Sequence, residues 1–241
     1  MKTISFEAHP EIFNAIPHPK PAGQYIPDWY KKMSKMRPST SHASTPFGET
    51  TLKVNMPTVK GCMPVRDYLT SGYIIPAWHD IEIGVSDEGH YYDMTHSARI
   101  EKPGPIGIYY HEIDQVKGTP LEQFADGHKL MKLIGPWNIK TPPGYSTFFF
   151  SPFYHTSDVT ILPAIVDTDT YEDITQFPCI IPPTGCYVEQ GTPIIQAVPI
   201  KRESWNHTIE ASFVRTRLGQ LKNQLARSFY RRNNWTSKRY K

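Results

Sequence analysis

The chain has no long apolar run. Its longest apolar stretches, such as FFF at 148–150 and IIQAVPI at 194–200, are a small part of the 241 residues. A bilayer span needs about 20 apolar residues, so neither a membrane helix nor a membrane partner is expected. The first residues, MKTISFEAHPE, contain no apolar core of the kind found in secretory signals, and we expect no such signal. Hydrophobic residues at 39% and aromatic residues at 12% exclude a disordered chain.

Cysteine is scarce, and the histidines have no metal-binding spacing. The three cysteines, Cys62, Cys179 and Cys186, form no CxxC pair. An odd number without a secretory signal favours free thiols in a reducing compartment. The ten histidines show neither HxxxH nor HExxH spacing, so no metal site is predicted.

Acidic residues are missing from the end of the chain. No Asp or Glu follows Glu210, whereas nine of the 26 Lys and Arg lie after position 210. The first 210 residues carry 17 basic and 23 acidic side chains, a net charge of −6, and the last 31 residues carry +9. Such a tail suits an anionic partner: nucleic acid, an acidic protein face or a phosphate. A solvated basic helix that only aids solubility is the alternative.

Proline, by contrast, is abundant. The 23 prolines argue against a mainly helical fold, because proline breaks helices and is found at strand ends and turns. Segments rich in β-branched and aromatic residues, bounded by turn residues, predict strands at 72–85, 105–113, 145–150, 158–166, 176–182 and 192–201. Short strands at this spacing predict a mainly β fold, a sandwich or barrel. One helical turn is predicted within 120–131.

The pattern divides the chain into three parts. Residues 1–57 predict a proline-rich, irregular N-terminal arm, with a short helix at 26–33 and a Ser/Thr-rich loop at 39–45. A β domain is predicted for residues 58–206. Residues 207–241 predict a basic C-terminal helix and tail.

The predicted C-terminal helix spans 207–232. This stretch has no proline, and its apolar residues recur at three- and four-residue intervals, as on one face of an amphipathic helix. Its polar face is basic. We expect the apolar stripe to pack on the body of the protein or on a neighbouring subunit.

Three short motifs resemble the β-clip fold of the dUTPase and dCTP deaminase superfamily. PPGY at 142–145 is similar to the first turn of that family, IVDTD at 165–169 to its aspartate motif and GTPIIQ at 191–196 to its last motif. Their order and spacing also agree with the family. The resemblance implies a dUTPase-like sandwich or barrel and a homo-oligomer, because trimers are favoured in this superfamily.

The same resemblance implies roles for single residues. Asp167 would orient the attacking water as a general base, Asp169 would help to place it, and Mg²⁺ would bridge the phosphates. Tyr145, Tyr171 and Gln196 become candidates for ligand binding.

Two departures from the family pattern point away from catalysis. The stretch SPFYHTS at 151–157 has no Arg or Lys where the family grips phosphates. The glycine-rich C-terminal arm that closes over the triphosphate is also missing. The alternative for VDTD is a simple turn, in which Asp167 is structural.

Most of the chain also resembles an uncharacterised family from tailed phages and some bacteria. The likeness is carried by IPDWYKKM (26–33), TVKGCMPVRDYLTSGYIIPAW (58–78), PWNIKTPPGYS (136–146), IVDTDTY (165–171) and GTPIIQAVPIKRESW (191–205). It implies a phage origin, a place in the virion or the host cytoplasm, and other phage proteins as partners. It implies no activity.

Three functions follow as hypotheses. The favoured one is a non-catalytic β-clip phage protein without a cofactor, which acts by binding as a structural or interaction component of a particle or assembly. The second is a nucleotide-processing enzyme, a dUTP pyrophosphatase or dCTP deaminase relative, that uses Asp167 with Mg²⁺. The third is a nucleic-acid-binding protein whose tail stacks on bases and contacts phosphates, with the candidate residues Arg231, Arg232, Trp235, Lys238 and Arg239.

Overall fold

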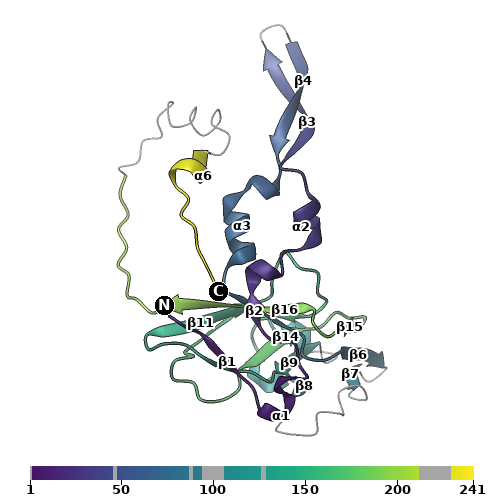
Figure 1. Cartoon of the computed structure of the whole chain (residues 1–241). Coiled ribbons are helices and arrows are strands. Elements are labelled where there is room, and N and C mark those ends of the chain that lie inside the picture. The colour runs from purple at the N-terminus through teal and green to yellow at the C-terminus, as the bar shows by residue number, and fades with distance from the viewer. Residues whose placement is uncertain (1, 46–47, 87–88, 94–105, 126–128, 212–228) are drawn as a thin grey trace. The chain divides into compact units, whose positions relative to one another are not determined.

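The chain forms two compact units in the computed structural model. The structure describes residues 2–45, 48–86, 89–93, 106–125, 129–211 and 229–241 (Figure 1). It is mainly β, with several antiparallel sheets and a few short helices, which confirms the predicted fold class at this level. The β body comprises Met1–Tyr25 and Gly72–Glu203, and the arm–tail unit comprises Ile26–Ser71 and Ser204–Lys241. The predicted three-part division at 57 and 206 stays a prediction.

Antiparallel sheets build the β body. In spatial order, the five-stranded sheet consists of β13 (Ala164–Val166), β11 (Tyr145–Phe150), β16 (Pro193–Lys201), β5 (Tyr73–Pro76) and β2 (Lys20–Pro21). The four-stranded sheet consists of β12 (Thr160–Ile161), β14 (Gln176–Ile180), β9 (Leu130–Ile134) and β8 (Gly107–Tyr110). Two smaller sheets join β15 (Cys186–Val188), β6 (Ile81–Ser86) and β7 (Gly89–Asp93), and β1 (Ser5–Glu7) with β10 (Asn138–Lys140). The short helices are α1 (Pro10–Phe13), η1 (Ala22–Gln24), η3 (Ile113–Gln115) and α4 (Glu122–Ala125).

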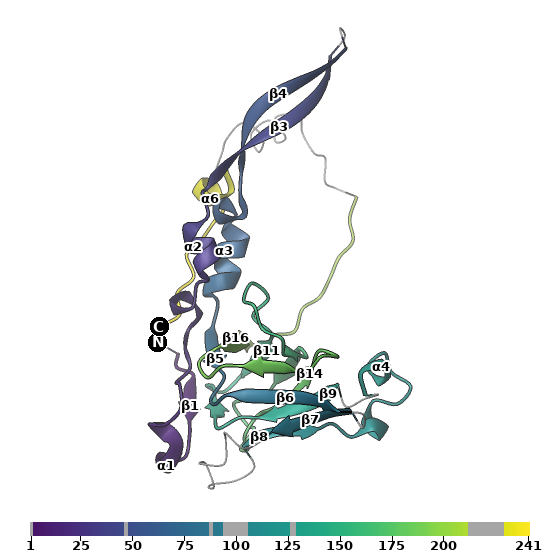
Figure 2. The same cartoon turned by 90° about the vertical axis from the view of Figure 1, so that its right-hand side faces the viewer.

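One apolar core joins these sheets. The five-stranded sheet contributes Ile75, Phe149 and Ile195, and the four-stranded sheet contributes Leu133 and Phe177, all of them buried. The rings of Phe149 and Phe177 meet edge to face, with centroids 5.2 Å apart. Figure 2 shows β11 and β16 of the first sheet lying above β8 and β9 of the second, and side chains of both sheets meet in one apolar core.

The strongest strand predictions are confirmed. The segments at 145–150, 176–182 and 192–201 form β11, β14 and β16, and the segment at 105–113 contains β8. The helical turn expected within 120–131 is α4. The sequence did not predict β9, β10 or β15 as separate strands.

Two predicted strands are broken in the structure. The segment at 72–85 forms β5 and β6, which belong to different sheets, because the chain leaves β16 after Pro76. The segment at 158–166 forms β12 and β13 on either side of Leu162 and Pro163. Proline lacks the N–H that a continuous ladder requires, so the break falls there.

The arm–tail unit contains a long β hairpin and short helices. The helix predicted at 26–33 is confirmed as α2 (Asp28–Lys32), with the acid in its first turn and the lysines in its last turn, as the helix dipole favours. β3 (Met36–Thr45) pairs with β4 (Gly48–Pro57) along its whole length. η2 (Val59–Gly61) and α3 (Met63–Thr70) follow.

The prediction of an irregular arm was wrong. The expected loop at 39–45 lies inside β3, because threonine favours extended backbone and β4 offers a partner for each residue. Residues 5–7 and 20–21 are also strands, paired with β10 and β5 of the β body.

The predicted C-terminal helix falls mostly on residues 212–228, which lie outside the described residues. Residues 207–211 are not helical, so the predicted start was wrong, and β-branched Thr208 and Ile209 lower helix propensity there. At the far end, α6 (Phe229–Asn233) is helical.

Gly72 tests how closely β5 approaches β16. Its φ is +67°, and a Cβ added to it lies 2.1 Å from the carbonyl oxygen of Ala197. Gly118 has a φ of +74° with nothing within 4 Å of the added Cβ. We expect Gly118→Ala to cost about 1–2 kcal/mol of unfolding free energy through backbone strain alone, and Gly72→Ala to cost clearly more. Urea unfolding of both variants measures the difference, and equal losses contradict the close approach.

Candidate functional site

The aspartate motif forms a turn at the end of β13. Asp167, Thr168 and Asp169 follow this strand, which pairs with β11 through Thr147 and Val166. The carbonyl oxygen of Asp167 accepts hydrogen bonds from the backbone N–H groups of Thr170 (3.1 Å) and Tyr171 (2.9 Å). These bonds close the turn, which we call the aspartate turn (residues 167–171).

Thr168 fixes the aspartate turn to the β body. Its side chain is buried, and its Oγ1 lies 2.7 Å from Oγ1 of Thr141 and 2.8 Å from Oγ1 of Thr147. The backbone N–H of Thr141 donates to the carbonyl oxygen of Thr168 at 3.2 Å. Because these buried hydroxyl groups satisfy one another, shifting the turn leaves polar groups unpaired, which is costly. The carboxylates on either side of Thr168 are therefore held in fixed positions.

Asp169 is locked in an ion pair with Arg202. Its Oδ1 accepts from Nη1 of Arg202 at 2.8 Å, and its Oδ2 accepts from Nη2. Oδ2 also accepts from the backbone N–H of Gly144 at 2.8 Å, and the side chain is only 5% exposed. The bonds from Arg202, and then the bond from Gly144, lower the pKa of Asp169 to about 2. Asp169 is thus a fixed anion with both oxygens engaged.

Asp167 is the open carboxylate of the turn. Its side chain is 61% exposed, its Oδ1 accepts from the hydroxyl of Ser146 at 2.6 Å, and the same oxygen lies 3.2 Å from Nη1 of Arg202. Among the described residues, nothing donates a hydrogen bond to its Oδ2. That oxygen can meet water or a ligand.

Arg202 is the residue that the sequence reasoning missed. It directly follows β16, whose register pairs Lys201 with Tyr145, so Arg202 comes to lie beside Gly144 and donates its backbone N–H to that carbonyl at 2.9 Å. Its Nη1 also lies within hydrogen-bond distance of the Tyr145 carbonyl (3.3 Å) and Ser146 Oγ (3.2 Å). The signal in the sequence was a cation one residue beyond the last core strand. Using that signal required the pairing of β16 with β11.

The other predicted ligand-binding residues of the β body do not share one surface. The hydroxyl of Tyr145 accepts a hydrogen bond from Lys2, whose ammonium lies 4.1 Å from the ring centroid. The hydroxyl of Tyr171 reaches the carbonyl of Ile174 at 3.5 Å, and its backbone belongs to the aspartate turn. Gln196 is buried in β16 opposite Phe150, at the other end of β11 from Tyr145.

Two of the predicted tail residues are anchored on α3. Nε1 of Trp235 donates to both oxygens of Asp67 (2.9 and 3.0 Å), and Nζ of Lys238 donates to Oδ2 at 2.6 Å. Burial acts to raise the pKa of Asp67, but the bonds from Lys238 and Trp235 outweigh burial and lower it. Arg231, Arg232 and Arg239 are exposed. The structure thus separates the tail residues into anchors and exposed cations.

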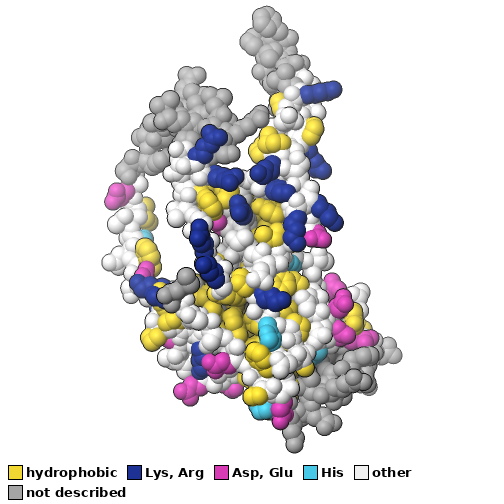
Figure 3. Space-filling model, in the orientation of Figure 1, with side chains coloured by type: hydrophobic (Ala, Val, Ile, Leu, Met, Phe, Trp, Pro, Cys, Tyr) yellow, Lys and Arg dark blue, Asp and Glu magenta, His cyan; other side chains and the backbone are white. Residues whose placement is uncertain are grey.

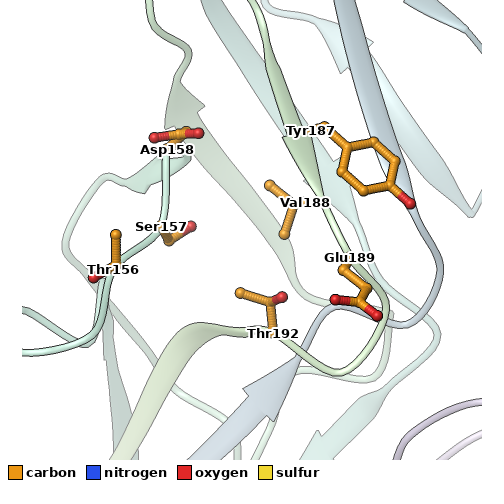
Figure 4. Close-up of a pocket in the computed structure, with 7 residues that line it drawn as sticks. All are labelled: Thr156, Ser157, Asp158, Tyr187, Val188, Glu189 and Thr192. Atoms are coloured by element: carbon orange, nitrogen blue, oxygen red, sulfur yellow. The ribbon is translucent and has the colours of Figure 1, made fainter. Parts of the chain in front are cut away.

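A pocket of about 290 Å³ lies elsewhere on the β body (Figure 4). Its lining consists of Thr156, Ser157, Asp158, Tyr187, Val188, Glu189 and Thr192. The lining contains two carboxylates and no Lys or Arg, so its charge repels phosphate. The pocket does not overlap the aspartate turn.

Two of the three thiols are protonated at neutral pH, and the described residues contain no cluster of metal ligands. All three cysteines are free, Cys179 is buried and Cys62 is exposed. Burial raises the pKa of Cys186 to about 11 and raises that of Cys179 as well, so both are protonated thiols at neutral pH. No three His, Cys, Asp or Glu side chains gather as metal ligands among these residues.

The comparisons with known proteins give no family. The chain matches no protein-family model and none of the curated proteins. In the described residues, every helix is too short or too polar to cross a bilayer.

The pKa of Asp169 predicts how stability depends on pH. Because its folded pKa lies below the ordinary value of 3.8, the contribution is complete above about pH 4 and is lost as the pH falls toward about 2. We expect Asp169→Asn to be less stable than the wild type at pH 7 and to lose less stability over this acid range. Asp173→Asn is the matched control, since Asp173 is exposed and, among the described residues, accepts a side-chain bond only from its neighbour Ile174.

Urea unfolding followed by circular dichroism, in steps from pH 7 to pH 2, makes this measurement. The control should follow the wild type at each pH. If the unfolding free energy of Asp169→Asn also equals that of the wild type at each pH, the ion pair does not stabilise the fold.

Proposed function

We propose that the chain is a non-catalytic, dUTPase-like β-clip protein that acts by binding, as a structural or interaction component of a phage particle or assembly. The positions of the three motifs support the β-clip part of the proposal. PPGY leads into β11, IVDTD covers the end of β13 and its turn, and GTPIIQ opens β16. These strands are neighbours in the order β13–β11–β16, and the first two motifs meet where the N–H of Gly144 donates to Asp169, whereas GTPIIQ lies at the opposite end of β11.

The non-catalytic part of the proposal rests on the ion pairs in which Arg202 is already engaged. A triphosphate carries several negative charges and needs cations that are preorganised to receive it. Here the guanidinium is bound to Asp169 in the bidentate manner and also contacts Asp167, so the three side chains together carry a net charge of −1. A phosphate must displace a carboxylate from Arg202 before it can bind there.

The lysines nearest to the aspartate turn in the five-stranded sheet and β10 are also engaged. Lys201 forms an ion pair with Glu203, and Nζ of Lys140 donates to the carbonyl of Tyr171 at 2.8 Å. Each of these cations among the described residues is therefore already bound to a neighbouring group. The same residues instead hold the strand ends together.

Large apolar side chains on the surface support a binding role. Phe153 is 80% exposed and Ile165 is 62% exposed on the β body. Ile165 lies in β13, the edge strand of the five-stranded sheet, and an exposed apolar edge strand is a typical site of pairing with another chain. We propose that the partners are further copies of the chain, as a trimer, and other phage proteins, in the virion or the host cytoplasm.

A second candidate, nucleotide processing with Asp167 as general base, has one observation in its favour. Ser146 and Arg202 hold Oδ1 of Asp167 while Oδ2 stays open, and such a carboxylate can take a proton from water. Magnesium binding by both aspartates does not fit, because Mg²⁺ needs carboxylate oxygens and those of Asp169 are engaged.

A turnover assay separates the two candidates. We expect the full chain, incubated with dUTP or dCTP and Mg²⁺ and followed by chromatography, to release no dUMP and to form no dUTP from dCTP. Asp167→Asn should match the wild type in this assay and in its circular dichroism spectrum. Turnover that disappears in a folded Asp167→Asn variant contradicts the proposal and establishes the enzyme.

The oligomeric state tests the assembly part. Sedimentation velocity at micromolar concentration should show a closed trimer, because a β-clip subunit is proposed to complete its surface with neighbours. The double variant Phe153→Ser/Ile165→Ser should shift the distribution toward the monomer. A wild-type monomer at this concentration contradicts the proposed assembly.

A further inference from the structure

The two compact units carry opposite charge. Among the described residues, the β body has eight Lys and Arg against 15 Asp and Glu, a net charge of −7. The arm–tail unit has 12 Lys and Arg against four Asp and Glu, a net charge of +8. Charge of one sign in so small a unit destabilises it by self-repulsion unless an anionic partner is bound.

Two of the acidic residues in the arm–tail unit already form ion pairs within that unit. Asp28 lies 3.2 Å from Nζ of Lys31 and 4.0 Å from Nζ of Lys32. Asp67 is taken up by Trp235 and Lys238 of the tail. Neither carboxylate is left to neutralise the other cations.

Contacts within the unit bring arm and tail together. The backbone N–H of Thr58 donates to the carbonyl of Lys35 at 3.0 Å, which holds the two ends of the hairpin side by side. Lys60 donates to the carbonyl of Lys31 and so joins η2 to α2, while Asp67 joins α3 to the tail. Figure 3 shows the resulting face, on which Lys and Arg side chains gather over α2, α3 and α6 with little acidic colour between them.

Eight cations on this unit form no ion pair with any described residue. They are Lys35, Arg37, Lys53, Lys60 and Arg66 in the arm and Arg231, Arg232 and Arg239 in the tail. Arm and tail both contribute, so the basic surface is composite. It differs from the tail-only surface expected from the sequence, because Trp235 and Lys238 serve as anchors.

Exposed aromatic side chains neighbour basic residues of this unit in the sequence. Trp29 is 40% exposed in α2, next to Lys31 and Lys32 in sequence, and Tyr230 is 49% exposed in α6, next to Arg231. Cations interleaved with exposed aromatic faces are the combination that contacts phosphates and stacks on bases.

The hairpin has the shape and composition for a nucleic-acid groove. β3 and β4 form a two-stranded sheet of ten residues per strand, about 34 Å long at the usual rise of β-strands. Its residues include seven Ser and Thr, the cations Arg37 and Lys53, and a single acid, Glu49. Hydroxyl groups donate to phosphate oxygens, and a two-stranded ribbon fits the major groove of a duplex. A two-stranded sheet alone is marginally stable in water, so a bound partner would stabilise the hairpin.

We infer that the arm–tail unit is a nucleic-acid-binding module that holds the phosphodiester backbone with the composite basic surface of α2, the hairpin and the tail. This inference goes beyond the proposed function, since it concerns a different unit and does not depend on the aspartate turn. Both double and single strands offer the required phosphates, and the ribbon favours the duplex.

Fluorescence anisotropy of the full chain with a labelled 20-base-pair duplex, and with one of its single strands, tests the inference. We expect the duplex to bind more tightly and the affinity to fall about 100-fold between 50 and 200 mM salt, as for about four phosphate contacts. Lys35→Glu/Arg231→Glu should weaken binding and reduce the salt slope by about 2. Lys20→Glu/Lys117→Glu, an equal charge change on the β body, should leave both unchanged.

Two results overturn the inference. One is equal weakening by the two double variants, because binding then follows net charge and no particular surface. The other is a poly-glutamate peptide that binds as tightly as the duplex and displaces it, which identifies an acidic protein surface as the partner. Circular dichroism of each variant confirms that it is folded.

Discussion

Arg202 and Asp169 join the ends of three neighbouring strands. The guanidinium stands at the end of β16, the carboxylate belongs to the turn after β13, and the N–H of Gly144 at the start of β11 donates to the same carboxylate. The pair is asymmetric: the Asp169 side chain is nearly buried, whereas that of Arg202 is partly exposed. Removing Arg202 therefore leaves an unpaired carboxylate that water hardly reaches, whereas removing Asp169 leaves a guanidinium that water can partly solvate.

This ion pair also explains what the aspartate turn can do. The residue types that a catalytic site needs are present, but each is already bound to another. Arg202 offsets carboxylates that would otherwise repel a phosphate, and a phosphate would have to displace a carboxylate to reach it. The chemistry of such a turn is thus decided by what its cation contacts, and here the contacts are internal.

How much the sequence predicts depends on whether the determining interactions are local. β11 and β16 were predictable because uninterrupted apolar and β-branched runs bounded by turn residues specify a buried strand. The hairpin of β3 and β4 was not predicted, because its Ser- and Thr-rich strands have no apolar alternation and are strands only through pairing with each other. Proline at 163 breaks a strand that looked continuous, and the change of sheet after Pro76 follows from tertiary pairing alone.

The residues of the candidate site also divide into those that the local sequence indicates and those that only long-range strand pairing brings in. The sequence identified Asp167 and Asp169, whose spacing lies within one turn, but not Arg202 or Ser146, which reach them only through the register of β11 with β16 and β13. The basic tail was evident from composition. Its anchoring to Asp67 was not, because 168 residues separate Asp67 from Trp235. Long-range partners of this kind need the topology before they can be named.

The central claim is that Arg202 is committed to the aspartates. The most direct measurement is a titration of the ¹⁵N-labelled full chain with dUTP and Mg²⁺ that follows the side-chain Nε–Hε signal of Arg202, assigned with Arg202→Lys. We expect this signal to stay in place while added nucleotide reaches millimolar concentration. A saturable shift of the Arg202 signal, with release of Asp169, would contradict the account, because the guanidinium would then be a phosphate ligand.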